Sequence, residues 1–163
     1  MNYLTHYPSP IGILTLASNG TALTGLWIEN QAHFCSFLTG DETEQDNLPV
    51  FNITRTWLDA YFAGLQPSPA LLPLAPEGSD FRRRVWKILL EIPYGQTTTY
   101  GEISHKLGAG CAQAVGGAVG HNPISIIIPC HRVLSSNGNL TGYAGGIERK
   151  LWLLNHEGLE IRK

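Results

Sequence analysis

A cysteine directly followed by a histidine is the feature of this sequence best suited to chemistry. Cys130 and His131 come after an apolar run, residues 124–128, that predicts a buried strand. We therefore predict a positioned thiol at the end of a rigid element. Neighbouring side chains in an extended segment point apart, so whether His131 can reach Cys130 stays open at this point.

Turn and loop residues surround the predicted thiol on both sides. Asn122 and Pro123 lie just upstream, and the glycine-rich stretch 141–146 lies just downstream. Functional groups are often mounted on such loops by a rigid scaffold. The segment from Asn122 to Gly146 is therefore the candidate site.

The other two cysteines, Cys35 and Cys111, do not suggest a disulfide framework or a zinc site. They are widely spaced, and the sequence holds no C-x-x-C pair. We interpret both as inert thiols in a reducing compartment. The N-terminus does not look like a signal peptide, and no apolar run is long enough to span a membrane. We therefore expect a cytoplasmic protein that does not contact a membrane.

The formal net charge of −2 hides a strong asymmetry along the chain. Residues 1–80 contain one basic and eight acidic residues, whereas residues 81–163 contain ten basic and five acidic ones. The cluster of Arg82, Arg83, Arg84 and Lys87 favours a polyanionic partner. The alternative is that this cluster is simply the solvated face of a helix.

The elements expected in residues 1–75 form a small scaffold domain. Residues 11–17 and 22–29 predict a hairpin around residues 18–20, followed by an acidic loop over 41–47. Apolar residues at helical spacing predict a helix over 51–62. Residues 67–76 contain four prolines and predict a linker, so we place the boundary between domains 1–75 and 76–163 there.

Residues 76–163 are expected to be mainly helical. A helix over residues 81–92 is followed by a capping-box sequence at 99–102 that opens a short helix, and a second short helix covers 112–119. These two short helices are a helix-turn-helix candidate. A last helix over 147–156 should bury Ile147, Leu151 and Leu154.

The predicted helix over 112–119 has no charged side chain and consists largely of alanine and glycine. One interpretation is a buried helix packed tightly against a neighbour. The other is a helix thin enough to enter the minor groove of DNA, which is only about 6 Å wide.

The chain from about Phe81 to Gly158 resembles the O6-alkylguanine-DNA alkyltransferases, also called methylated-DNA–protein-cysteine methyltransferases. The matching motifs are residues 114–118 (AVGGA), 122–123 (NP), 128–133 (IPCHRV), 142–146 (GYAGG) and 156–158 (HEG). The resemblance of residues 1–75 is weaker and rests mainly on residues 7–12. It implies an α/β (α+β) fold, in which a small RNase H-like sheet-plus-helix domain precedes a helical domain with a helix-turn-helix of winged-helix type.

The resemblance also implies the chemistry. Cys130 would accept an alkyl group from guanine O6, once per protein molecule. His131 would deprotonate the thiol through a water and Glu157 would polarise His131, while Asn122 would tie the helix-turn-helix to the cysteine loop. No cofactor and no metal are expected; some relatives hold zinc in the N-terminal domain, but its ligand set is missing here.

The partner implied is double-stranded DNA containing O6-alkylguanine, bound through the minor groove by a monomer with little sequence preference. The damaged base would be flipped out of the helix. The residues expected to bind the substrate are Tyr100, Gln113, Val133, Tyr143, Ala144 and Gly145. The residues expected to contact DNA are Ala112, Ala114, Gly116, Arg82 and Arg83. The range of alkyl groups, activity on O4-alkylthymine and cooperative binding along DNA are left open.

Two positions depart from the family pattern. Gln113 stands where the family usually has an arginine that fills the gap left by the flipped base, and Ala144 stands where several relatives have serine. A glutamine carries no charge and stacks poorly, so we expect weaker capture of lesions in duplex DNA, with unchanged thiol chemistry.

Three other functions are compatible with parts of this pattern. The first is a lesion-sensing protein that flips alkylguanine without accepting the alkyl group, although such proteins replace the acceptor cysteine. The second is a thiol hydrolase that uses Cys130 and His131 over many turnovers. The third is a transcriptional regulator, but the small second helix lacks side chains that read base edges in the major groove.

Overall fold

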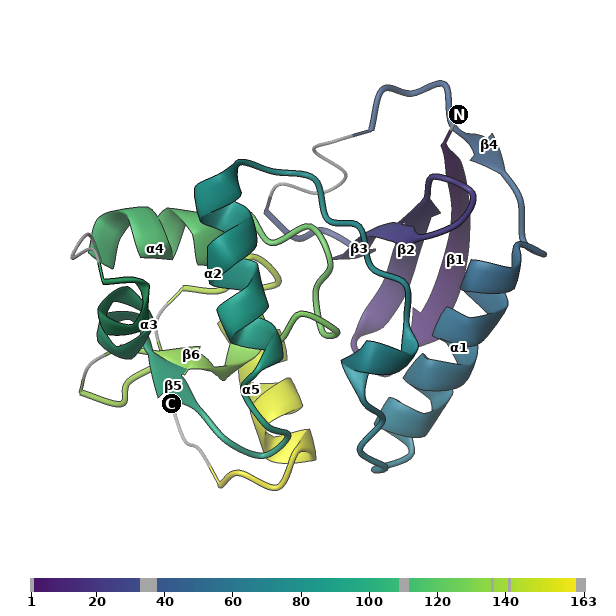
Figure 1. The fold of residues 1–163 in the computed structure, drawn as a ribbon. Coiled ribbons are helices and arrows are strands. Elements are labelled where there is room, and N and C mark those ends of the chain that lie inside the picture. Colours follow the sequence, from purple (N-terminus) through teal and green to yellow (C-terminus); the bar gives the residue numbers. More distant parts are fainter. Residues whose placement is uncertain (1, 33–37, 109–111, 136, 141, 161–163) are drawn as a thin grey trace. The chain divides into compact units, whose positions relative to one another are not determined.

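The computed structural model describes residues 2–32, 38–108, 112–135, 137–140 and 142–160. The chain forms two compact units (Figure 1). The N-terminal unit contains residues 1–77 together with 123–125, and the C-terminal unit contains residues 78–122 and 126–163. No helix among the described residues is long and apolar enough to cross a membrane.

The N-terminal unit is a four-stranded sheet with one long helix. Its strands are β1 (Tyr3–Ser9), β2 (Gly12–Ser18), β3 (Leu23–Ile28) and β4 (Thr43–Glu44). Their order is β3-β2-β1-β4; the first three are antiparallel neighbours and β4 runs parallel to β1. The predicted hairpin is β2–β3, and the predicted acidic loop contains β4.

Helix α1 (Pro49–Phe62) contacts β1 and β2 and closes the core of this unit. It starts two residues earlier than predicted because proline is favoured in the first turn of a helix, where its missing N–H costs nothing. The fully buried side chains of the strands and this helix include Leu14, Leu16, Trp27, Phe51, Leu58 and Tyr61. Gly25 is required by the Trp27 ring, since a Cβ at position 25 would lie 2.1 Å from it.

The proline-rich segment predicted as a linker is bonded to the sheet. Residues 69–71 form a 3-10 turn, and the segment after it pairs with the free edge of β3. There the Leu23 amide donates to the Pro73 carbonyl at 2.8 Å, and the Ala75 amide donates to the Leu23 carbonyl at 2.8 Å. Part of the predicted linker is therefore an ordered edge segment of the sheet. Proline has no N–H to donate, but its carbonyl can still accept at a sheet edge.

The segment before the cysteine also differs from its prediction. Residues 124–128 are buried, as their composition requires, but they do not form a strand. Ile124 makes a single bridge with Leu26, and Ile126 has a left-handed backbone with φ 72°. A β-branched residue rarely adopts that conformation, and it breaks the extended run. Hydrophobicity alone does not distinguish a buried strand from a buried irregular segment.

In the described part of the C-terminal unit, four α-helices accompany a small parallel sheet. The helices are α2 (Asp80–Leu90), α3 (Tyr100–Leu107), α4 (Ala112–Gly120) and α5 (Ile147–His156), and the sheet pairs β5 (Thr98–Thr99) with β6 (Val133–Leu134). Helix α4 packs against α2 and α3, and the Trp86 indole N–H donates to the Ala118 carbonyl at 2.8 Å. The connection between α3 and α4 lies largely outside the described residues, and the winged-helix assignment stays a prediction.

Local sequence signals set the helix ends in this unit. The Thr99 hydroxyl caps α3 by accepting from the Glu102 amide at 3.1 Å, as the capping-box sequence predicts. The Glu102 carboxylate, however, accepts from the Thr98 hydroxyl at 2.9 Å. Helix α5 has the predicted bounds, but it buries Lys150, Leu153 and Leu154, while Ile147 and Leu151 are only half-buried. The predicted buried face was therefore partly wrong.

Candidate active site

Cys130 lies in a 3-10 turn, Cys130–Arg132, that leads directly into β6. Because β6 pairs with β5, this turn is anchored beside the start of α3. The thiol is buried, with 4% of the residue exposed. It is a free cysteine; Cys35 and Cys111 lie outside the described residues.

Burial raises the pKa of the Cys130 thiol above its ordinary value, because a thiolate loses its hydration there. Hydrogen bonding by the Asn122 and Tyr143 side chains and the positive charge of Lys150 partly oppose this effect. Asn122 is itself held by its amide nitrogen, which donates to the Ile128 carbonyl at 2.8 Å. The resting sulfur is therefore a protonated thiol, and only its polar neighbours Asn122, Tyr143 and Lys150 favour the thiolate.

His131 is fully buried and bonded to Glu157 at the end of α5. Its Nε2 lies 2.6 Å from Glu157 Oε2. Burial alone would raise the pKa of Glu157, but His131 and Arg132 outweigh it and hold that pKa well below its usual range. The carboxylate is thus ionised and accepts, so His131 Nε2 carries the proton and Nδ1 is left with a lone pair.

The pKa of His131 is lowered chiefly by burial, and the charges of Arg132 and Lys150 add to this against the opposing effect of Glu157. The imidazole is therefore neutral at neutral pH, as a base must be. Among the described residues, no hydrogen-bond partner reaches His131 Nδ1. The ring thus offers one unbonded acceptor atom in the turn that carries the thiol.

Lys150 is a member of this cluster that sequence reasoning missed. It is fully buried on α5, and its ammonium donates to the Val133 carbonyl at 2.6 Å and the Gly142 carbonyl at 3.3 Å. Burial lowers its pKa to about 8, and the Cys130 sulfur opposes that shift. The signal was available, since position 150 follows Ile147 by three residues and precedes Leu154 by four, which places all three on one face of a helix.

The predicted substrate-binding residues lie on several elements of the C-terminal unit. Tyr100 is half-buried at the first position of α3, immediately after β5. Val133 is buried in β6, next to the cysteine turn. Tyr143 and Ala144 are half-buried and Gly145 is buried in the loop before α5. These positions come from three separate segments that the small parallel sheet and α5 hold together.

Helix α4 combines the two sequence interpretations. Val115, Ala118 and Val119 are buried against the rest of the unit, so one face is a packing face. Ala112, Gln113, Ala114 and Gly117 are exposed and Gly116 is half-buried, so the opposite face is thin and uncharged. No bulky side chain among these described residues would keep a nucleic acid from that face.

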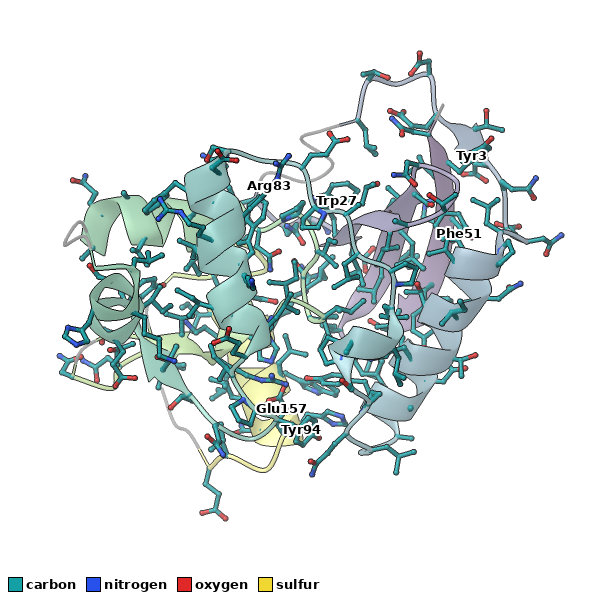
Figure 2. The ribbon with its side chains drawn as sticks, viewed as in Figure 1. Tyr3, Trp27, Phe51, Arg83, Tyr94 and Glu157 are labelled. Atoms are coloured by element: carbon teal, nitrogen blue, oxygen red, sulfur yellow. The ribbon has the colours of Figure 1, made fainter. Side chains whose placement is uncertain are left out.

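The predicted basic residues lie on α2. Arg82 is half-buried, whereas Arg83 and the neighbouring Arg84 and Lys87 are exposed. Arg83, Arg84 and Lys87, together with Asp80, line an open depression on this helix; Arg83 is labelled in Figure 2. Among the described residues, no group of three His, Cys, Asp or Glu side chains could hold a metal ion.

Comparison with known proteins assigns both units. Residues 2–76 match the family model described as the ribonuclease-like domain of 6-O-methylguanine DNA methyltransferase, and residues 80–159 match that of its DNA-binding domain. A methylated-DNA–protein-cysteine methyltransferase of Haemophilus influenzae is 44% identical over 156 residues, covering 95% of this chain and 86% of the relative. A Mycobacterium tuberculosis protein of the same name is 48% identical over 159 residues, covering 94% and 93%.

Solved structures agree with these matches. The crystal structure of an O6-methylguanine methyltransferase from Mycobacterium tuberculosis has a TM-score of 0.84 and 48% identity, and the similarity covers 96% of this chain and 93% of that one. A structure of the protein from that organism in complex with DNA has a TM-score of 0.84 and 47% identity, with coverage of 95% and 92%. The mixed α/β fold predicted from the sequence is confirmed. The chain belongs to the 6-O-methylguanine DNA methyltransferase family.

Proposed function

We propose that this protein repairs O6-alkylguanine in double-stranded DNA by transferring the alkyl group to Cys130, once per molecule. The observation that carries the proposal is a buried thiol flanked by Asn122 and Lys150, in the same turn as a neutral histidine that is bonded to an ionised glutamate. Family membership supplies the substrate class, since relatives of similar length are methylated-DNA–protein-cysteine methyltransferases.

The transfer is a single in-line displacement. His131 Nδ1 takes the thiol proton, directly or through a water, and Glu157 stabilises the resulting imidazolium. The Cys130 sulfur then attacks the alkyl carbon, so that a C–S bond forms as the bond from carbon to guanine O6 breaks. The electron pair of the broken bond stays on the base, and Tyr100 donates a hydrogen bond to it. The proton that His131 took from the thiol then passes through solvent to the base, which leaves as neutral guanine. A thioether does not hydrolyse readily, so the protein is consumed.

The thin face of α4 is proposed to enter the minor groove, with Ala112, Ala114 and Gly116 against the DNA. Arg82 and Arg83 would contact phosphates, which gives affinity without sequence preference. Because guanine O6 is hidden inside a duplex, the base is flipped into a pocket formed by Val133 and the loop Tyr143–Gly145. Gln113 would occupy the gap that the base leaves.

The remaining predictions follow from this arrangement. Residues 76–163 carry DNA binding and transfer, and residues 1–75 act as a scaffold. We propose that the protein acts as a monomer in the cytoplasm, without a cofactor. Competition between duplexes containing O6-methylguanine and O4-methylthymine would measure whether the second lesion is also a substrate.

Stoichiometry and turnover test the proposed function. Increasing amounts of a duplex containing one O6-methylguanine are mixed with the protein, and the repaired guanine is measured by chromatography of the hydrolysed DNA. We expect repair to stop at one lesion per protein chain and to be absent in Cys130→Ser. Repeated turnover would indicate a different enzyme, and tight binding without loss of the methyl group would indicate a lesion sensor.

A further inference from the structure

The carboxylate of Glu157 is held by more than His131. Its Oε1 accepts from Arg132 Nε at 2.7 Å and from the Gly95 amide at 3.2 Å, while Oε2 bonds His131 at 2.6 Å. All three donors meet a carboxylate whose side chain is fully buried. The two oxygens therefore have separate partners, and the oxygen that serves His131 cannot rotate away while Oε1 is held.

Arg132 is fixed at its other end by the turn that follows α2. One of its terminal nitrogens donates to the Ile92 carbonyl at 2.7 Å, and its guanidinium lies over the Tyr94 ring at 5.8 Å from the centroid. The Tyr94 hydroxyl in turn donates to the His156 carbonyl at 3.3 Å. Figure 2 labels Tyr94 and Glu157 beside each other at this point.

Gly95 contributes through its backbone. It has a left-handed conformation with φ 76°, and a Cβ at this position would lie 3.1 Å from the Glu157 carbonyl oxygen. A glycine allows both that conformation and that close approach, and it lets the amide point at the carboxylate. The turn after α2 is thus hydrogen-bonded to the end of α5 through Tyr94 and Gly95, which lie outside the cysteine loop.

We infer that Arg132 is a positioning residue for alkyl transfer: with Gly95 it clamps Glu157 so that one carboxylate oxygen serves His131, and it keeps a positive charge beside that pair. This inference rests on the proposed transfer to Cys130. The charged groups that act on His131 are Glu157 and Lys150 from the end and middle of α5 and Arg132 from its own turn. The Glu157 carboxylate raises the pKa of His131 and the Arg132 charge lowers it. Removing the Arg132 charge should therefore raise the pKa of His131, so that the imidazole stays protonated up to a higher pH.

The test is the pH dependence of single-turnover transfer from an O6-methylguanine duplex at saturating protein. In Arg132→Met we expect the acid limb of the profile to move up by about one pH unit, which lowers the rate on that limb roughly tenfold, and the plateau to fall. Arg132→Lys keeps the positive charge but loses the planar guanidinium that bonds both Glu157 and the Ile92 carbonyl. The acid limb of its pH–rate profile should therefore return toward that of wild type, while the rate on the plateau stays low.

Arg55→Met is the matched control. Arg55 is half-buried in the N-terminal unit, where it also bonds a main-chain carbonyl and a hydroxyl, at 2.8 and 2.6 Å. The Arg55→Met variant measures the effect of losing a hydrogen-bonded arginine elsewhere in the protein, without altering the His131–Glu157 pair. If the Arg132→Met profile coincides with that of Arg55→Met, the inference is wrong. If Arg132→Met does not fold, the Arg132→Lys variant decides. The inference is then wrong if the pH–rate profile of Arg132→Lys matches that of wild type in both its acid limb and its plateau. Absence of transfer in wild type would instead refute the proposed function.

Discussion

Replacing Lys150 by methionine tests whether a buried ammonium contributes to the candidate site. At neutral pH the charged lysine pays for its burial, since its pKa falls from 10.5 in the unfolded chain to about 8. That shift of 2.5 units corresponds to a cost of about 3 kcal/mol when the group is fully protonated in both states. Methionine removes the cost but leaves the buried Val133 carbonyl and the exposed Gly142 carbonyl without this donor, and the loss at Val133 costs about 1–3 kcal/mol.

The net stability change at pH 7 is therefore small, and the pH dependence is the informative quantity. Between about pH 8 and 10.5 the unfolded chain binds more protons at Lys150 than the folded chain does, so stability rises with pH in that window. The free energy of unfolding of wild type minus that of Lys150→Met should thus increase by about 2 kcal/mol from pH 7 to pH 9.5. The titration of Cys130 also makes the free energy of unfolding depend on pH, but it is present in both proteins, so most of its contribution cancels in this difference.

Urea unfolding at a series of pH values measures this difference, with Lys106→Met on the exposed face of α3 as the control. The same variant should also transfer a methyl group roughly tenfold more slowly at neutral pH, because the Cys130 thiolate loses a nearby positive charge. If the difference in unfolding free energy does not change with pH, folding does not lower the pKa of Lys150 and the electrostatic reasoning fails.

Three further predictions concern the remaining site residues. Asn122→Ala should slow transfer at least about tenfold in single-turnover assays and lower the free energy of unfolding by about 1–3 kcal/mol, because the Ile128 carbonyl loses its donor; an unchanged rate would contradict its role beside the thiol. Glu157→Gln should destabilise the fold by about 3–5 kcal/mol in thermal unfolding, because it leaves Arg132 buried without its anion. Since the pKa of Glu157 is lowered on folding, wild type should lose stability as pH falls below about 4.5, a loss that the variant should not show. Gln113→Arg should speed repair of duplex DNA and leave the reaction with the free alkylated base unchanged. Equal repair rates of wild type and variant on duplex DNA would contradict our interpretation of Gln113.

The sequence predicted the elements whose signals are local. The β2–β3 hairpin, the helix α3 with its Thr99 cap and the bounds of α5 all follow from periodicity, turn residues and capping. The position of Cys130 also followed, because a cysteine beside a histidine among turn residues is a local pattern. Family resemblance then supplied a role for Glu157, which lies far along the chain.

What the sequence could not predict depends on tertiary packing. The residues before Cys130 are apolar enough for a strand, yet the left-handed, buried Ile126 turns the chain. Lysine is rarely buried, so residue type gave no sign that Lys150 lies inside, although its helical position indicated a buried face. The contact between Gly95 and Glu157 joins residues 62 positions apart, and no local signal indicates it.

Methylation of Cys130 itself is the central claim, and mass spectrometry of the intact protein followed by peptide mapping tests it most directly. The protein is mixed with an equimolar duplex that carries one O6-methylguanine. We expect a gain of one methyl group in place of one hydrogen, confined to the peptide that contains Cys130 and saturating at one per chain. No gain in mass with the lesion still bound, or a methyl group on another residue, would contradict it.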